Sequence, residues 1–320
     1  MTAAALPADL PQTDPDVVID VEGLTKKFGE RTVVKDLTMQ VRRGLIYGFL
    51  GPNGSGKTTT IRMLTGLLTP DSGRGTCLGY DILTQSTEIK RHVGYMTQKF
   101  SLYTDLSIRE NLEFIGRVHG LSDPRGAASE AIARLGLENR ASQLAGELSG
   151  GWKQRLALGA CILPKPDLLL LDEPTAGVDP KARREFWDEI HHLAHDGMTV
   201  LVSTHYMDEA ERCHEIAYIA YGELLTHGTV DEVVAQSGLA TYTVTGRDLS
   251  ALADQLSKTE GVDQVAPFGS ALHISGRDKA RLDAAIEALP ETEGVEVTPS
   301  EPTLEDVFIE LMSQSRDNFA

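Results

Sequence analysis

One short stretch of this chain is more informative than any other: it reads Gly51-Pro52-Asn53-Gly54-Ser55-Gly56-Lys57-Thr58 and matches the pattern G-x-x-x-x-G-K-[ST] in full. Its glycines let the backbone curl so that several N–H groups point at one anion, and a helix beginning there adds positive potential. Lys57 supplies a point charge for the outer phosphates, and the Thr58 hydroxyl can ligate Mg²⁺. The stretch, with Thr59 behind it, predicts a nucleotide-phosphate site.

The residues on either side of this loop fit the same interpretation. Residues 45–50 form a short apolar run that ends at Gly51, as a buried strand would, and residues 58–68 carry apolar side chains at helical spacing. A strand before the loop and a helix after it are the context that the pattern requires. Further out, residues 17–21 and 37–41 predict strands, and residues 71–80 predict small antiparallel strands.

A second apolar strand ends in two acidic residues. Residues 168–171 are four consecutive leucines, followed by Asp172 and Glu173. The carboxyl ends of parallel strands lie at one edge of a sheet, so these carboxylates should reach the edge that holds the phosphate loop. Asp172 then suits a Mg²⁺ contact and Glu173 suits polarising an attacking water.

Composition bounds the class of protein. The chain has 320 residues and a net charge of -17, with 41% hydrophobic and 24% charged residues, which is an ordinary globular balance. The negative charge argues against nucleic acid as a partner, because phosphates would repel it. We find no run of about 20 apolar residues, so we predict no membrane span. The three cysteines lie far apart and predict free thiols.

The chain divides into segments of different character. We expect a flexible tail at residues 1–16 and an α/β domain at residues 17–236, with strands and helices alternating as in a parallel sheet and a helical subdomain at about residues 99–165. Residues 237–320 should form a smaller domain, since strands and helices follow there in the order βαββαβ, the ferredoxin-like pattern.

A third motif lies between the phosphate loop and the acidic strand end. It reads Leu148-Ser149-Gly150-Gly151-Trp152, just before a predicted helix, and a serine with glycine N–H groups at a helix start can bind another anion. With this motif the chain resembles the ATP-binding-cassette (ABC) ATPases over about residues 17–234. Their signature is Leu-Ser-Gly-Gly-Gln, so Trp152 departs from it and puts the contacts of the glutamine side chain in doubt.

The resemblance implies roles for further residues. Phe28 matches the aromatic that stacks on adenine, Gln98 the glutamine that senses Mg²⁺ and water, Asp179 the loop that crosses a dimer interface, and His205 the histidine that contacts the γ-phosphate. We therefore expect a P-loop NTPase fold of ABC type, with a parallel core, a small antiparallel subdomain and a helical subdomain.

The expected reaction is Mg²⁺-dependent hydrolysis of ATP. Catalysis would rest on Glu173, His205, Gln98 and Lys57, and Mg²⁺ would be held by Thr58, Gln98 and Asp172. Each ATP would lie between residues 51–59 and Phe28 of one subunit and Ser149, Gly150, Gly151 and Asp179 of a second. A homodimer is expected, and pairing with a different cassette stays open.

The resemblance also implies what the ATPase would drive. The family's work is passed to a separate integral-membrane permease, docked near Gln98 and a helical segment at residues 99–118, which places the chain at the cytoplasmic face of the inner (plasma) membrane. The Tyr95-Met96-Thr97-Gln98 stretch and the closing residues 301–308 resemble the drug-resistance and multidrug exporters. The alternative is a soluble ABC-type regulatory ATPase. The cargo, and the choice between a dimer-contact and a regulatory role for the C-terminal domain, stay open.

Overall fold

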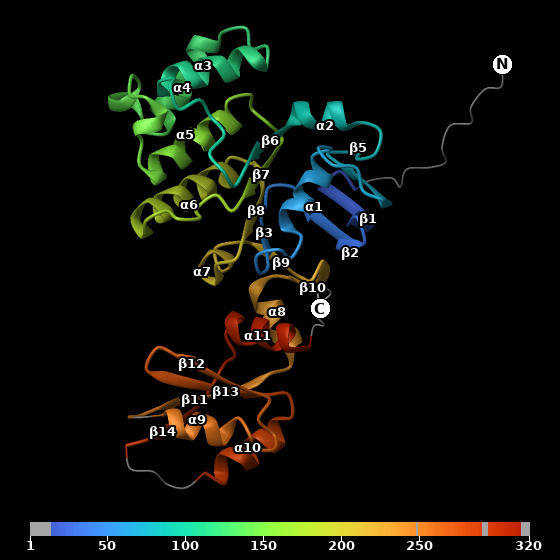
Figure 1. The fold of residues 1–320 in the computed structure, drawn as a ribbon, viewed down its shortest axis with the longest axis vertical. Helices are drawn as coiled ribbons and strands as arrows, with labels where there is room; N and C mark the ends of the chain where they lie inside the picture. Colours follow the sequence, from blue (N-terminus) through green and yellow to red (C-terminus); the bar gives the residue numbers. More distant parts are fainter. Residues whose placement is uncertain (1–13, 248, 290–293, 315–320) are drawn as a thin grey trace, which may run out of the picture. The chain divides into compact units, whose positions relative to one another are not determined.

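The chain forms two compact units in the computed structural model, which describes residues 14–247, 249–289 and 294–314 (Figure 1). The first unit runs to Leu224 and the second begins at Leu225. This boundary lies before the expected one at residue 236, because helix α8 (Val230–Ser237) packs against α11 (Leu304–Gln314) of the second unit. Most of the expected tail, residues 1–13, lies outside the described residues.

A six-stranded sheet forms the centre of the first unit, and the chain passes the boundary at Leu224 within its edge strand β10. Its order is β10-β9-β3-β8-β7-β6, and the pairs from β9 to β6 are parallel. Every residue of β3, β7 and β8 is buried, as expected for parallel strands covered on both faces. The strands are β3 (Ile46–Leu50), β6 (Val93–Met96), β7 (Leu168–Asp172), β8 (Thr199–Thr204), β9 (Glu215–Ala220) and β10 (Glu223–Gly228).

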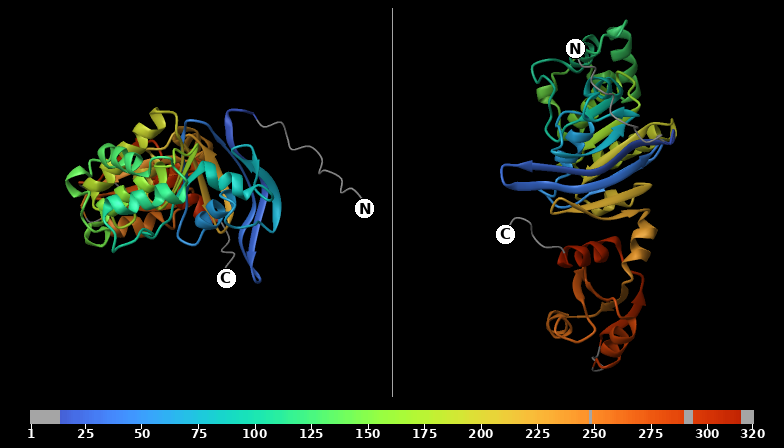
Figure 2. Two further views of the ribbon diagram at one scale, coloured as in Figure 1. Left: turned by 90° about the horizontal axis from the view of Figure 1, so that it is seen from above. Right: turned by 90° about the vertical axis from the view of Figure 1, so that its right-hand side faces the viewer.

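A separate antiparallel sheet has the order β2-β1-β4-β5. Its strands are β1 (Val17–Phe28), β2 (Arg31–Arg42), β4 (Ser72–Cys77) and β5 (Tyr80–Asp81). The first two extend well beyond the predicted residues 17–21 and 37–41, and the right-hand view of Figure 2 shows them in blue as one long hairpin. Register shifts along the β1–β2 pair explain the difference, because each bulge resets the alternation that a sequence pattern relies on.

Helices dominate residues between β6 and β7: α3 (Ile108–Val118), α4 (Pro124–Arg134) and α5 (Gly150–Ile162). The local sequence Ser107-Ile108-Arg109-Glu110 has the spacing of a capping box, and this box is present at the start of α3. The expected helical segment at residues 99–118 is wrong in its first half, since the helix begins only at Ile108. Buried Asn111 explains this, because its amide bonds the backbone of Tyr103, Leu106 and Ser107 and so holds the preceding loop in place.

The second unit contains the predicted strand and helix order. A four-stranded antiparallel sheet, β12-β13-β11-β14, carries α9 (Ser250–Leu256) and α10 (Lys279–Glu287), and the elements follow one another in the order βαββαβ. Its core includes Val244, Leu256 and Ile274. The strands are β11 (Ala240–Thr245), β12 (Gln264–Phe268), β13 (Ala271–Gly276) and β14 (Glu296–Ser300).

The remaining helices flank the parallel sheet: α1 (Lys57–Leu64), α2 (Ser86–His92), α6 (Pro180–His195) and α7 (Met207–Ala210). Trp187 of α6 is fully buried, so it belongs to the core. Across the residues that the structure describes, we find no helix both long and apolar enough to cross a membrane.

Candidate functional site

The loop between β3 and α1 has a backbone that only glycine can adopt at two points. Gly51 has φ +153°, and a Cβ there would lie 2.0 Å from the carbonyl oxygen of Ile219 on β9. Gly56 has φ +107°, and a Cβ there would lie 2.7 Å from the carbonyl oxygen of Val33. The loop is therefore pressed against two neighbouring segments, and its tight curl at the helix start suits a phosphate cradle.

Lys57 lies inside this loop and is almost fully buried. Its ammonium donates to the carbonyl oxygens of Gly51 (2.7 Å) and Pro52 (3.0 Å) and lies 3.4 Å from Glu173 Oε1. Burial lowers the pKa of Lys57, while the Glu173 carboxylate acts in the opposite direction. The lysine thus keeps a charge partner on one side and two neutral carbonyl groups on the other.

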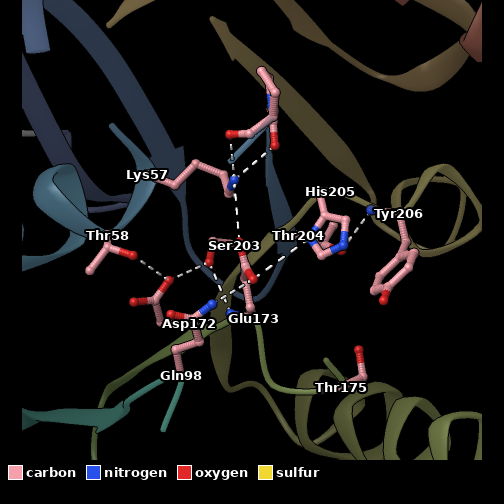
Figure 3. Close-up of polar contacts among 12 residues, drawn as sticks. Lys57, Thr58, Gln98, Asp172, Glu173, Thr175, Ser203, Thr204, His205 and Tyr206 are labelled. Atoms are coloured by element: carbon pink, nitrogen blue, oxygen red, sulfur yellow. Dashed lines mark hydrogen bonds and ion pairs between the residues drawn. The ribbon is translucent and has the colours of Figure 1, made fainter. Parts of the chain in front are cut away.

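The carboxyl ends of β7 and β8 bring polar groups beside α1. Asp172 Oδ1 accepts hydrogen bonds from the Thr58 hydroxyl (3.0 Å) and from the Ser203 hydroxyl (2.7 Å) (Figure 3). These hydroxyl and carboxylate oxygens are the hard ligands that Mg²⁺ prefers. Within the described part of the chain, no group of three or more His, Cys, Asp or Glu side chains is arranged so that it could hold a metal ion.

Glu173 has an unusual backbone conformation. Its φ is +48°, in the left-handed region that non-glycine residues rarely adopt. Its N–H donates both to the Ser203 carbonyl oxygen (3.1 Å) and to the Ser203 hydroxyl (3.0 Å), which holds the residue in this conformation. Such strain is maintained by surrounding contacts and is characteristic of functional sites. Here it turns the carboxylate toward Lys57.

Gln98 and His205 complete the ring of groups around Glu173. The Gln98 amide donates to Glu173 Oε2 (2.9 Å), and His205 Nδ1 lies 3.6 Å from the same oxygen. The His205 ring lies against Tyr206, with centroids 4.1 Å apart. The structure therefore brings together groups from four separate segments of the sequence, namely Lys57 and Thr58, Gln98, Asp172 and Glu173, and His205 (Figure 3).

The two glycines of the Leu-Ser-Gly-Gly motif lie beside residues 177–182. Ser149 precedes α5 and its side chain makes no bond to the helix it caps, so the hydroxyl is unused there. Positions 150 and 151 approach the next loop: a Cβ on Gly150 would lie 3.8 Å from the Gly177 carbonyl, and one on Gly151 would lie 2.5 Å from Ala182 Cβ. The Asp179 carboxylate caps α6, accepting from the N–H groups at Lys181 and Ala182.

Two aromatic residues remain accessible. Phe28, at the end of β1, is 53% exposed, and its ring is free to stack while the Lys26 ammonium lies 5.8 Å from its centroid. Trp152, which replaces the signature glutamine, is packed between two guanidinium groups, at 4.8 Å from Arg140 and 5.2 Å from Arg155. The indole is thus held by cation–π contacts within its own chain.

Four residues of this region were missed in the sequence: Thr175, Ser203, Thr204 and Glu209. Each is buried: the Ser203 hydroxyl accepts from the Glu173 N–H, and the Glu209 carboxylate accepts from the hydroxyls of Thr175 and Thr204. Ser203 and Thr204 end β8 directly before His205, so their place at the carboxyl end of a predicted strand was an available signal. Thr175 and Glu209 gave no such signal, since their meeting depends on the tertiary structure.

Known proteins resemble this chain over most of its length. A family model described as "ABC transporter" matches residues 34–176. The chain is 47% identical to "Probable multidrug ABC transporter ATP-binding protein YbhF" of Escherichia coli over 70% of its own length, but it spans only 39% of that relative. It is 34% identical to "Daunorubicin resistance ATP-binding protein DrrA3" of Streptomyces coeruleorubidus, covering 94% of this chain and 98% of the relative.

Two further comparisons agree. "Nod factor export ATP-binding protein I" of Cupriavidus pinatubonensis is 37% identical over 96% of this chain and 94% of its own length. A solved structure entitled "Structure of ATP binding subunit of ABC transporter" superposes with a TM-score of 0.63 at 29% identity, covering 69% of this chain and 93% of that one. The chain belongs to the ABC transporter family, as one of its ATP-binding proteins.

Proposed function

We propose that this chain binds and hydrolyses ATP as the motor subunit of an exporter. One observation carries the hydrolysis: Lys57, Asp172, Glu173, Gln98 and His205 surround a single site, although they come from different elements. A lysine at a phosphate loop beside a carboxylate that can orient water is what phosphoryl transfer to water needs, because positioning and electrostatics supply most of its catalysis.

Each side chain has a definite task in this reaction. Lys57 leaves the Gly51 and Pro52 carbonyl oxygens and binds the outer phosphates. Their negative charge offsets the cost of burying the lysine ammonium. Glu173 orients the attacking water, and Gln98 and His205 hold its Oε2 from two sides. Phe28 stacks on the adenine, while residues 51–59 grip the phosphates.

Mg²⁺ fits the same site. Thr58 Oγ1 and Asp172 Oδ1 lie 3.0 Å apart and offer a hydroxyl and a carboxylate oxygen. Gln98, whose amide nitrogen donates to Glu173 Oε2, would add its amide oxygen as a third ligand. When bound, the ion neutralises phosphate charge. Ser203 keeps Asp172 turned toward Thr58, so the two protein ligands remain together.

A head-to-tail dimer would complete the nucleotide site. Within one chain, Gly150 and Gly151 lie against residues 177–182. The unused Ser149 hydroxyl and the start of α5 are suited to the γ-phosphate of an ATP held by a second subunit. Gly177, with φ +72°, and Asp179 lie in the loop that would meet that subunit.

Export through a separate membrane permease is the work that we assign to the motor. The relatives' names refer to multidrug transport, daunorubicin resistance and Nod factor export. A cavity of about 150 Å³ follows β6 and is lined by residues of the 97–102 loop, α3 and α5, where the permease would dock. This partner would hold the chain at the cytoplasmic face of the plasma membrane.

Hydrolysis is tested on the purified full-length chain with Mg²⁺ and ATP. Glu173→Gln should bind ATP normally and lose nearly all turnover, while Lys57→Ala should weaken nucleotide binding measured by equilibrium titration. Lys90→Ala, at an exposed lysine of α2, serves as the control and should match wild type. Turnover by Glu173→Gln at the wild-type rate would remove Glu173 from the mechanism.

Assembly needs its own measurement. Glu173→Gln with saturating ATP should double the mass seen by light scattering, and Ser149→Arg should prevent this by blocking the helix start. Purification from detergent extract should recover an integral-membrane protein with the chain. A chain that stays monomeric under these conditions and recovers no membrane protein contradicts the motor assignment.

A further inference from the structure

Glu209 is a buried glutamate of the first unit, and it lies outside the motifs described in the sequence. It lies on the short helix α7, and its side chain is 0% exposed. Burying a carboxylate is costly unless hydrogen bonds and charges compensate it. Its oxygens are compensated: Oε1 accepts a short hydrogen bond from the Thr175 hydroxyl, and Oε2 accepts one from the Thr204 hydroxyl at 2.7 Å.

The two hydroxyls come from the two loops that carry the groups around the γ-phosphate position. Thr175 follows Glu173 by two residues, and Thr204 directly precedes His205. Thr204 Oγ1 also accepts from the Tyr206 N–H at 3.0 Å, which fixes the backbone on both sides of His205. One carboxylate therefore links the loop behind Glu173 to the loop of His205 (Figure 3 shows both threonines).

Arg183 adds a third element to the same carboxylate. This residue of α6 places its Nε 3.5 Å from Glu209 Oε1, and its guanidinium lies 4.2 Å from the centroid of the Tyr206 ring. A second acidic residue, Asp208, lies 3.6 Å from Arg183 Nη1 and shares its charge. The group formed by Thr175, Arg183, Thr204 and Glu209 thus joins both loops to α6.

We infer that Glu209 is a positioning residue for ATP hydrolysis, which sets the separation of Glu173 and His205 by bridging Thr175 and Thr204. This rests on the proposed function. Glu209 bonds Thr175 and Thr204, whereas Lys57 of the phosphate loop is held by Gly51, Pro52 and Glu173. Loss of Glu209 should therefore lower kcat while nucleotide binding persists. A displacement of about 1 Å at a reacting group can cost on the order of 100-fold in rate.

The test compares variants of the full-length chain in Mg²⁺ and ATP, with binding followed by trinitrophenyl-ATP fluorescence. We expect Glu209→Ala to lower kcat about 10- to 100-fold and to leave Kd and KM within about threefold. The kcat of Glu209→Gln should lie between those of wild type and Glu209→Ala, because an amide can accept from one hydroxyl and donate to the other. Glu211→Ala is the matched control, because Glu211 is an exposed glutamate two residues after Glu209, and its kcat should equal that of wild type.

The threonines separate positioning from general support of the fold. Thr175→Val and Thr204→Val remove one hydroxyl each and keep the shape, so they remain informative if Glu209→Ala does not fold. Their effects on kcat should not add, because both act through one carboxylate. Thr175→Ser and Thr204→Ser keep the hydroxyl, so their kcat should equal that of wild type. A contribution to folding alone would lower the melting temperature and leave kcat per folded molecule unchanged.

Two results overturn the inference. In the first, folded Glu209→Ala, or both valine variants, hydrolyse ATP within twofold of wild type while Glu173→Gln is inactive, and only the role of Glu209 fails. In the second, wild type shows no more turnover than Glu173→Gln, and the proposed hydrolysis itself fails together with this inference. The comparison with Glu173→Gln keeps the two results apart.

Discussion

Ser203→Ala should destabilise the first unit by an amount that the structure allows us to estimate. The Ser203 side chain is fully buried, and its hydroxyl donates to Asp172 Oδ1 (2.7 Å) and accepts from the Glu173 N–H (3.0 Å). A hydrogen bond to a charged group contributes about 1.5–3 kcal/mol and a neutral one about 0.5–1.5 kcal/mol. The second loss is at the low end, because the Glu173 N–H keeps the Ser203 carbonyl as acceptor.

The expected loss is therefore about 2–4 kcal/mol of the free energy of unfolding. Urea unfolding followed by tryptophan fluorescence measures it, since the chain's two tryptophans, Trp152 and Trp187, both lie in the first unit. Ser142→Ala, at an exposed loop serine, should stay within about 0.5 kcal/mol of wild type. A Ser203→Ala chain as stable as Ser142→Ala would refute the account of how Asp172 and Glu173 are held.

Three further predictions follow from single positions. Gly51→Ala should abolish nucleotide binding by titration, since its methyl would lie 2.0 Å from the Ile219 carbonyl, whereas Gly197→Ala, also at positive φ but with open space around it, should bind normally. Burial lowers the pKa of His191 below its ordinary 6.5, so the unfolded chain binds more protons there; the free energy of unfolding should fall from pH 7 to pH 5, and less so in His191→Gln. Burial raises the pKa of the Cys77 thiol to about 12, so maleimide should label Cys77 at pH 8 only after unfolding, and rapid labelling of the folded chain would contradict this.

Local patterns in the sequence were enough for the elements and for the principal motifs. Three features depend on only a few neighbouring residues: the phosphate loop, the leucine strand before Asp172 and the capping box at Ser107. They can therefore be recognised in the sequence without knowledge of the fold. The βαββαβ order of the second unit is local in the same sense, because the period of apolar residues separates strand from helix.

The sequence was less informative where the chain departs from a regular period. The long β1–β2 hairpin contains repeated register shifts between Val21 and Lys27, and its length beyond residues 17–21 and 37–41 was not predicted. The loop before α3 was mistaken for helix, because what holds it is the Asn111 side chain reaching back to Tyr103 and Leu106. A side chain that satisfies a loop's backbone leaves no periodic pattern.

Only the tertiary structure decided how the site is held together. The parallel register of β7 and β8 sets Asp172 opposite Ser203, which brings the serine hydroxyl between the two acidic residues. Glu209 bonds Thr175, which lies 34 positions earlier in the sequence. Such contacts depend on strand register and helix packing over the whole sheet, and no local spacing encodes them. The motifs could therefore be recognised in the sequence, whereas the residues that hold them in place could not.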